Sequence, residues 1–413
     1  MRPSILPPAA WVLAASAVCV HAQQAPDTIL FNGKIVTVDD FFTTQEAVAV
    51  EGERFTAVGT NAAIRPLAGA ATRVVDLGGR TVIPGLIDNH IHVIRATEYW
   101  PNEARLDGVT NRAEALALLE AKAGALPEGE WLMTLGGWTE NQFIGDQADF
   151  TLEELDDIAP DRPAYIQSTY DHAFANSAWF TEMGVPLVTD FDTASPGSDL
   201  ASHVVRDGNG AVTGRLNGGM AMINIATARF PEVPAERQSD AIRDAFSHFN
   251  SIGLTTAYDP GGGGIRAESY ERIWALAAER GLTLRVFHTL ARGAIPTTLQ
   301  EALDFAEEIR TVRPFQGDAT LDLIAVGENY YIPFQRDSLA GPIRPTAEAI
   351  EGGREILTAA ADGGWPVQTH SINPDTIDTF LDFVAEVNER YPLRQLRWSL
   401  THADRIARAQ AER

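Results

Sequence analysis

The sequence is almost devoid of cysteine: its 413 residues contain one, Cys19. We expect residues 1–22 to be a secretory signal peptide, because one arginine precedes an apolar run, residues 9–20, that is too short to cross a bilayer. Val20 and Ala22 supply the small residues expected before a cleavage point. An uncleaved anchor is the alternative. The expected mature chain is exported, periplasmic or secreted. It has no thiol, which excludes disulfides and cysteine catalysis.

Basic residues are also scarce. The chain has 32 Lys and Arg against 56 Asp and Glu, a formal net charge of −24. This balance argues against nucleic acid as a partner and against stable membrane association once the signal is removed. Glycines fill positions 261–264, but neither a Gly-Lys-Ser/Thr sequence nor G-x-G-x-x-G spacing accompanies them. The run therefore favours a flexible loop after a strand over a phosphate-binding loop.

Short β-rich runs separated by turn dipeptides, such as Asn32-Gly33 and Glu51-Gly52, occupy the segment after the signal. They predict a small N-terminal β-domain over residues 23–80. Residues 81–93 (TVIPGLIDNHIHV) then read as an apolar run that turns at Pro84-Gly85, resumes with Leu86 and Ile87, and carries two histidines at a strand's end.

Five further apolar runs follow at intervals of about 30 to 45 residues, with helix-like segments between them. They begin at Gly253, Leu282, Leu321, Trp365 and Leu396. Strands that alternate with helices at this interval predict a parallel sheet in an α/β domain over residues 81–413.

The stretch from about 94 to 250 is too long for a simple crossover, and we expect it to be an insertion. It contains expected helices at 111–125 and 235–249 and expected strands at 131–138 and 163–169. Its segment 184–215 reads as a loop.

Histidines and acids lie where these strands should end, and the carboxyl ends of parallel strands are where catalytic groups gather. Because strand residues two apart share a face, we expect His90 and His92 to lie side by side as half of a metal site. A chance pair at a buried strand end is the alternative. The later strands end at Asp259, His288, Glu328, His370 and His402.

The string IPGLIDNHIH at residues 83–92 resembles the first barrel strand of the metal-dependent amidohydrolase superfamily. From about Asp27 to the last residue the chain resembles its amidohydrolase-3 branch, which includes N-substituted formamide deformylase-like enzymes. The resemblance implies a TIM-type (β/α)8 barrel with a small β-sandwich. It also implies metal-dependent hydrolysis of non-peptide C–N bonds in amides, formamides or cyclic imides. Only about six βα units are present, so we expect the sequence to be a C-terminally truncated reading of a longer family member.

The resemblance further implies two metal ions. His90 and His92 would bind one and His370 and His402 the other, with Glu328 as the bridge where much of the superfamily has a carboxylated lysine. A solvated loop glutamate is the alternative for Glu328. This ligand set suits two Zn²⁺, with Mn²⁺, Fe²⁺ or Co²⁺ also compatible. Such ions lower the pKa of a bound water, so that a metal-bound hydroxide can attack, and polarise the scissile carbonyl.

The family's general-base aspartate belongs to an eighth strand that this sequence lacks; Asp404 and Asp259 are candidate replacements. Two segments resemble pocket-lining motifs of the branch, YDHAFANSAWF at 170–180 and GGWTENQF at 136–143. They nominate Trp138, His172 and Asn176 as contacts for a small-molecule substrate, with aromatic packing and helix capping as alternatives.

His288 is a further candidate substrate contact, or a hydrogen-bonded structural residue. Two other hypotheses stay open for the whole chain: a catalytically inactive periplasmic metal- or ligand-binding homologue, and a fragment that cannot fold alone. The oligomeric state cannot be inferred from the sequence.

Overall fold

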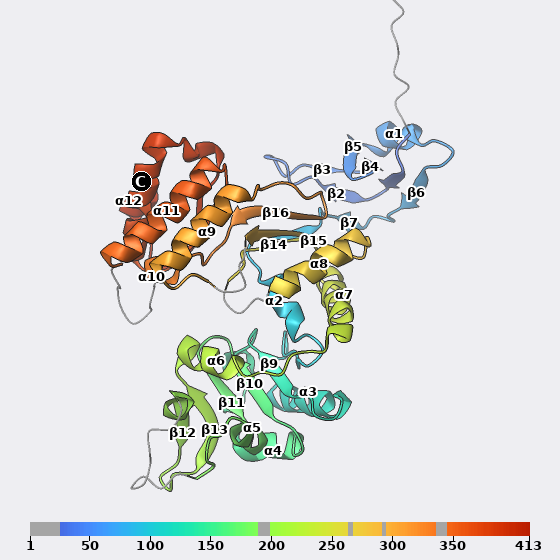
Figure 1. The fold of residues 1–413 in the computed structure, drawn as a ribbon. Helices are drawn as coiled ribbons and strands as arrows, with labels where there is room; N and C mark the ends of the chain where they lie inside the picture. The colour runs from blue at the N-terminus through green and yellow to red at the C-terminus, as the bar shows by residue number, and fades with distance from the viewer. Residues whose placement is uncertain (1–24, 189–198, 263–266, 291–294, 336–344) are drawn as a thin grey trace, which may run out of the picture. The chain divides into compact units, whose positions relative to one another are not determined.

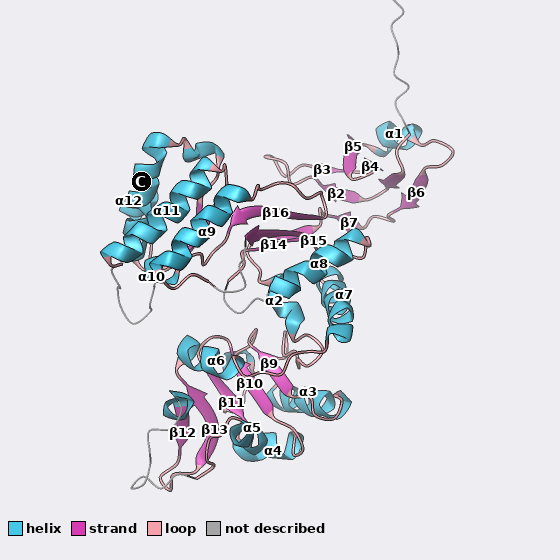
Figure 2. Cartoon of the chain, in the orientation of Figure 1, coloured by secondary structure: helices cyan, strands magenta, loops and turns pink. Residues whose placement is uncertain are grey.

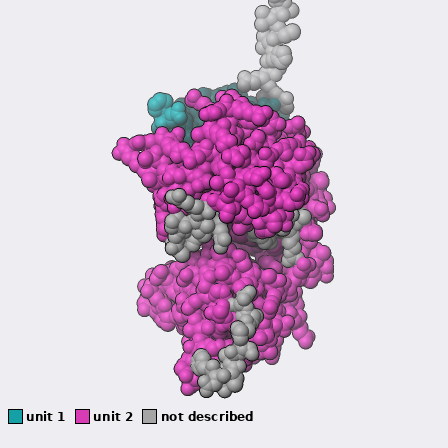
Figure 3. All heavy atoms as spheres, turned by 60° about the vertical axis from the view of Figure 1, so that its left-hand side comes forward, with its two compact units in different colours: residues 1–85 teal, residues 86–413 magenta. Residues whose placement is uncertain are grey.

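The computed structural model describes residues 25–188, 199–262, 267–290, 295–335 and 345–413. The expected signal peptide, residues 1–22, lies outside the described residues. The chain forms two compact units, Met1–Gly85 and Leu86–Arg413 (Figure 3). Within the described ranges, no helix has both the length and the apolar character needed to cross a membrane.

The N-terminal unit contains two small sheets. One has the order β5-β4-β1-β6 and the other the order β3-β2-β7. Their strands are β1 (Thr28–Phe31), β2 (Lys34–Val36), β3 (Thr44–Gln45), β4 (Ala47–Glu51), β5 (Arg54–Gly59), β6 (Arg73–Asp76) and β7 (Thr81–Val82), with a short helix α1 (Asn61–Ile64) after β5. Buried Ile35 of β2 and Val48 of β4 belong to one apolar cluster, so the two sheets pack against each other. Both predicted turns contain a residue in the left-handed region, Asn32 (φ 57°) and Gly52 (φ 57°).

Residues 81–93 divide between the two units at the turn expected at Pro84-Gly85. Thr81–Val82 pairs with β2 inside the N-terminal unit, whereas β8 (Leu86–Asp88) begins the second unit and pairs with β14. The Pro84-Gly85 dipeptide separates the two, because proline has no backbone N–H to donate to a ladder. The histidines therefore follow a strand of only three residues.

Six parallel strands in chain order form the centre of the second unit. Four make one sheet, β16-β15-β14-β8, and two make another, β17-β18. They are β8, β14 (Leu254–Asp259), β15 (Arg285–Leu290), β16 (Leu321–Val326), β17 (Gln368–Ser371) and β18 (Ser399–His402). A parallel bridge between Val326 and Val367 joins the two sets. The five predicted later strands are confirmed, and the fold is α/β (Figure 1).

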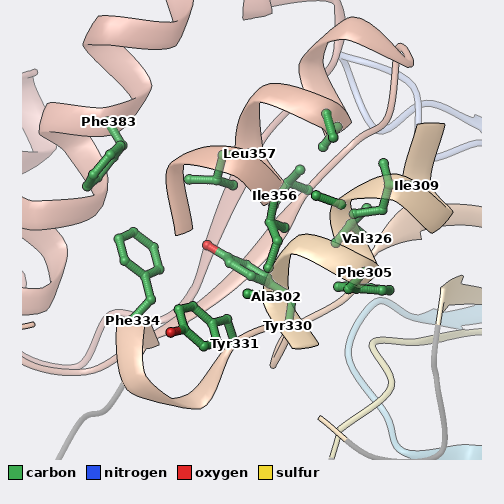
Figure 4. Packing of buried hydrophobic residues seen from close by; sticks show 14 of the residues in the cluster. Ala302, Phe305, Ile309, Val326, Tyr330, Tyr331, Phe334, Ile356, Leu357 and Phe383 are labelled. Atoms are coloured by element: carbon green, nitrogen blue, oxygen red, sulfur yellow. The ribbon is translucent and has the colours of Figure 1, made fainter. Parts of the chain in front are cut away.

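Helices alternate with these strands, as Figure 2 shows by colour. They are α7 (Ala235–Ser251), α8 (Ala267–Ala278), α9 (Leu299–Thr311), α10 (Ile332–Gln335), α11 (Ala347–Asp362), α12 (Pro374–Arg390) and α13 (Arg408–Glu412). Thr298 and Glu301 form a capping box that begins α9, and Thr346 caps α11. Ile309 of α9 and Ile356 of α11 pack with Val326 of β16 in a core with no exposed surface at these three residues (Figure 4). Each such aliphatic side chain contributes roughly 1.5–3 kcal/mol by burial.

The insertion builds its own five-stranded sheet, with the order β12-β13-β11-β10-β9. Its elements are α2 (Val93–Glu98), α3 (Arg112–Ala125), β9 (Leu132–Leu135), α4 (Leu152–Ile158), β10 (Ala164–Ser168), β11 (His172–Ala175), α5 (Ser177–Glu182), β12 (Val204–Arg206), β13 (Val212–Asn217) and α6 (Gly219–Thr227). The helices and strands predicted in this stretch are confirmed.

The expected loop at 184–215 was wrong where it is described, because β12 and β13 form a hairpin there. Asp207 accepts hydrogen bonds from the N–H groups of Asn209 and Ala211 and so closes the turn. Short β-branched runs on both sides of a DGNG turn were the signal that the sequence reading missed.

Candidate metal centre

Four imidazoles from three strand ends converge on the carboxylate of Glu328, which follows a fourth strand, β16. Glu328 Oε2 lies 3.0 Å from His90 Nε2 and 3.6 Å from His92 Nε2. Glu328 Oε1 lies 2.8 Å from His370 Nδ1 and 3.3 Å from His402 Nε2. One oxygen thus faces the β8 histidines and the other faces the histidines of β17 and β18. The five residues nominated as metal ligands meet in one place.

The first pair of histidines reaches this place by a turn rather than by strand alternation. Asp88 Oδ1 accepts the backbone N–H of His90 at 3.0 Å, an arrangement typical of an Asx turn, and it ends β8 there. The N–H of Ile91 then donates to the carbonyl of Tyr258. His92 precedes α2, and its Nδ1 donates to the carbonyl oxygen of Gly261 at 2.6 Å. This bond sets the tautomer and leaves Nε2 available as a ligand atom.

Hydrogen bonds to the backbone N–H and carbonyl of Glu328 hold this residue in position. Its N–H donates to the Pro260 carbonyl at 2.9 Å, and its carbonyl accepts from the N–H of His370 at 3.0 Å and from Gln335 Nε2. Buried Gln335 also accepts from the N–H groups of Tyr330 and Tyr331. Gln335 therefore ties the turn after β16 together. No motif in the sequence pointed to it.

The second pair comes from adjacent parallel strands. His370 lies in β17 and His402 ends β18, and their ring centroids are 4.5 Å apart. His402 (φ 65°) and Ala403 (φ 50°) both lie in the left-handed region, a backbone conformation that residues other than glycine rarely adopt. Strained backbone of this kind is concentrated at functional sites. Thr401 Oγ1 lies 3.0 Å from His90 Nδ1 and links the two histidine pairs.

The electrostatics favour an ionised bridge among imidazoles. Burial opposes ionisation of Glu328, but the adjacent imidazoles of His370 and His90 outweigh it and hold its pKa far below the usual range. The same contact with Glu328 raises the pKa of His90. Burial lowers the pKa of His92 to about 4, so its imidazole is neutral at pH 7. Neutral imidazole and carboxylate are the forms that bind divalent metals.

The residues fit a metal. Glu328 Oε2 is buried and makes no hydrogen bond of acceptable geometry, although two imidazole nitrogens lie within 3.6 Å. Ligand atoms at the metal–ligand distances of Zn²⁺ are themselves separated by about 3.3 Å. One ligand atom from each of His90, Glu328 and His402 also lies within 4.8 Å of the others.

Neither candidate general base contacts Glu328 in the described part of the chain. Asp259 is fully buried, and its two oxygens accept the N–H groups of Ile94 and Gly261. Burial raises its pKa to about 6. Asp259 thus connects the start of α2 to the turn that binds His92. Asp404 is exposed after β18.

The remaining nominated residues make local interactions. His288 Nε2 accepts from Trp274 Nε1 at 3.0 Å, and its Nδ1 lies 3.0 Å from the Thr289 carbonyl. Trp138 is 2% exposed, packs on Phe143 and donates to the Gln167 carbonyl.

Asn176 is fully buried. It caps α5 through Trp179 N–H and bonds the backbone of Ala159, Arg162 and Ala164. Helix capping for Asn176 and aromatic packing for Trp138 were the alternatives left open by the sequence, and these are the interactions that the structure contains.

His172 belongs to a charged group inside the insertion. Its Nε2 lies 2.9 Å from Glu140 Oε1 and its Nδ1 lies 2.9 Å from Asp171 Oδ2. The bond to Glu140 is the main reason that the pKa of His172 is raised. Burial disfavours the Glu140 carboxylate, but the bond to His172 reverses this and lowers its pKa. The neighbouring Tyr170, which the sequence reading passed over, contacts α2: Arg95 Nη2 donates to its hydroxyl at 3.2 Å.

The His172–Glu140 pair predicts a pH-dependent contribution to the stability of the fold. When folding raises the pKa of a histidine, the charged histidine adds to the free energy of unfolding. This contribution is complete at pH values below the ordinary pKa of 6.5, and it is lost as pH rises through the folded-state pKa. We expect His172→Gln to cost about 0.5–1 kcal/mol more at pH 6 than at pH 8.5, a range that allows for solvent screening. Urea unfolding of both proteins at the two pH values measures this difference. Glu140→Gln should remove the same difference, and parallel pH curves for wild type and His172→Gln would contradict the prediction.

Comparison with known proteins gives a consistent result. Residues 73–413 match the model of the Amidohydrolase family, described as Amidohydro_3. The chain is similar to N-substituted formamide deformylase of Arthrobacter pascens, at 28% identity over 270 residues, which are 64% of this chain and 48% of that protein. It is also similar to exoenzymes regulatory protein AepA of Pectobacterium carotovorum subsp. carotovorum, at 28% identity over 377 residues, 87% of this chain and 76% of that protein. The chain thus spans about half the length of the deformylase.

Among solved structures, a metal-dependent hydrolase from Pyrococcus furiosus superposes with a TM-score of 0.55 at 20% identity. The match covers 87% of this chain and 70% of that one. At this identity the likeness concerns the fold alone. The family match covers most of the sequence and includes Glu328 and the four histidines around it, and we conclude that the chain belongs to the amidohydrolase family.

Proposed function

We propose that this protein is a metal-dependent hydrolase of a non-peptide C–N bond in a small-molecule amide, formamide or cyclic imide. The observation that carries the proposal is the convergence of four imidazoles on the two oxygens of Glu328. The family match and the deformylase relative support the bond type.

The proposal extends to the architecture and the location of the protein. The six parallel strands are proposed to belong to a TIM-type barrel whose carboxyl-terminal rim carries the site. The two facing N-terminal sheets are proposed to be its β-sandwich, and the chain is proposed to be exported. The consecutive parallel order and the placement of every nominated ligand at a strand end support the barrel.

Each residue has a defined role in this scheme. His90 and His92 would hold one divalent ion and His370 and His402 a second, with Glu328 between them; two Zn²⁺ fit this donor set best. Such ions supply Lewis acidity that activates water and polarises a carbonyl. The Nδ1–H of His92, bound to Gly261, keeps Nε2 directed inward, and Gln335 keeps Glu328 in register with His370.

Metal analysis together with turnover tests the proposal. We expect two Zn²⁺ per chain by mass spectrometry of the metal content, and hydrolysis of formanilide, acetanilide or succinimide that a chelator abolishes and Zn²⁺ restores. A chain that binds two ions but hydrolyses none of these compounds would support an inactive metal-binding homologue instead. A cooperatively folded chain that binds no divalent ion would overturn both functions.

A further inference from the structure

We infer that Asp259 is a positioning residue that fixes the tautomer and orientation of His92 through the turn at Gly261. The inference rests on the proposed function for its consequence, which is that one of the two divalent ions depends on Asp259. It gives Asp259 a role other than the general base for which the sequence made it a candidate. It starts from a closed set of hydrogen bonds among the end of β14, the Gly261 turn and the start of α2.

Asp259 binds both backbone segments that flank the His92 ring. It ends β14 and is fully buried. Its Oδ2 accepts the N–H of Ile94 at 2.7 Å, and its Oδ1 accepts the N–H of Gly261 at 2.8 Å. The carbonyl oxygen of Gly261 in turn accepts the Nδ1–H of His92 at 2.6 Å. Because Ile94 lies two residues after His92, these contacts form a ring that begins and ends at the same residue.

The start of α2 obtains its cap from Asp259. His92 is the N-cap residue of this helix, and its side chain makes no capping hydrogen bond. The N–H of Ile94, the second residue of the helix, is a group that an N-cap side chain usually binds. Here the carboxylate of Asp259 binds it from another strand, with the negative charge that a helix N-terminus favours. The backbone of His92 is therefore held by Asp259 and not by a residue of its own segment.

Two glycines make the other half of the ring. Gly261 (φ 78°) and Gly262 (φ 116°) both have a positive φ, which glycine adopts without strain. A Cβ at position 261 would lie 2.6 Å from Thr289 Oγ1, and one at position 262 would lie 3.3 Å from His92 Cε1. The first two residues of the glycine run thus form a close-packed turn. This turn brings the Gly261 carbonyl to Nδ1 of His92.

The ring decides which nitrogen of His92 can bind an ion. A neutral imidazole has one N–H, and its donation to Gly261 leaves a lone pair on Nε2, which lies 3.6 Å from Glu328 Oε2. The tautomer with its proton on Nε2 has no lone pair there for a cation. Asparagine at position 259 has a single acceptor oxygen, so it can bind the N–H of Ile94 or of Gly261 but not both. Asp259→Asn therefore opens the ring without leaving a cavity.

The His92 tautomer can be read from ¹H–¹⁵N correlation spectra of the metal-free, full-length chain at pH 8. We expect the wild-type proton on Nδ1, and Asp259→Asn or Gly261→Ala to move about half of the population or more to Nε2. The chain has nine histidines, and the signals that His92→Gln lacks assign this ring. Asp322→Asn is the matched control and should leave the tautomer unchanged. Asp322 is buried in β16, and one of its oxygens accepts the N–H of Gly317, a bond that asparagine can keep.

Zn²⁺ titration measures the consequence for the two ions. Asp259→Asn should weaken one binding step about 10- to 100-fold, the usual effect of losing a group that orients a metal ligand, and leave the other within about twofold. In a His92→Gln background the same substitution should weaken Zn²⁺ binding no further, because Asp259 acts through His92.

The outcomes distinguish the positioning role from other roles of Asp259. An unchanged His92 tautomer in Asp259→Asn overturns it, and so does an additive loss of Zn²⁺ affinity in the double variant. Equal weakening of both binding steps together with a lower urea midpoint would make Asp259 a general stabiliser of the fold. Lost turnover at full Zn²⁺ occupancy, with the tautomer unchanged, would make it the general base.

Failure of the proposed function gives different results. A wild-type chain that binds two ions and hydrolyses no amide overturns the hydrolase, while a tautomer that depends on Asp259 still supports the positioning role. The same dependence in a chain that binds no Zn²⁺ overturns the metal-dependent function and retains the positioning of His92.

Discussion

Glu328→Gln is expected to reduce bound Zn²⁺ from the two ions per chain proposed above to one or none, and to lower any metal-dependent turnover by more than about 100-fold. The carboxylate is the only side chain that contacts all four imidazoles in the described residues. Glutamine has nearly the same shape but lacks the negative charge. Its amide nitrogen cannot bind a cation, so at least one side of the bridge loses its ligand atom. Mass spectrometry of metal content after gel filtration measures the loss.

Glu103→Gln is the matched control. Glu103 is partly buried, and its Oε1 accepts the N–H of Leu135, an interaction that a glutamine oxygen can keep. We expect this variant to bind as much Zn²⁺ as the wild type. Two tightly bound ions in Glu328→Gln would show that Glu328 is not the bridge.

Gly327→Ala is expected to destabilise the second unit by about 3 kcal/mol and to weaken metal binding with it. A Cβ at this position would overlap the Pro260 carbonyl oxygen and Thr289 Oγ1. The Pro260 carbonyl is backbone and cannot rotate away as a side chain could. It also accepts the N–H of Glu328, so the displacement that relieves the overlap moves the bridging carboxylate. Urea unfolding and Zn²⁺ titration measure the two effects.

Gly124→Ala provides the comparison, a glycine at which an added Cβ has room. It lies on the exposed side of α3, and a Cβ there meets no atom within 4 Å. Alanine should stabilise this helix by roughly 0.5–1 kcal/mol, because it loses less backbone entropy on folding. Equal unfolding midpoints for Gly327→Ala and the wild type would mean that the turn after β16 can rearrange and does not hold Glu328.

Much of the order of strands and helices in the α/β domain could be predicted from the sequence. Apolar runs separated by helix-like segments identified β14 to β18, because strands buried in a parallel sheet must be apolar on both faces. The same runs located His370 and His402 at their ends. The turn at Pro84-Gly85 was also readable, but a Pro-Gly break between apolar residues does not say which sheet each half joins. That depends on pairing with β2 and β14, which lie elsewhere in the sequence.

The sequence by itself indicated which histidines and acids lie at strand ends and in what order, because strand ends follow from local hydrophobic periodicity, and the family resemblance implied which of these residues are metal ligands. Only the tertiary structure decided how the site is held and what surrounds it. Asp88 turns His90 inward, Gln335 fixes Glu328, and Tyr170 rather than His172 contacts α2. Each of these depends on a contact set by backbone geometry or made between segments far apart in sequence, and such contacts form only when the packed fold brings the partners together.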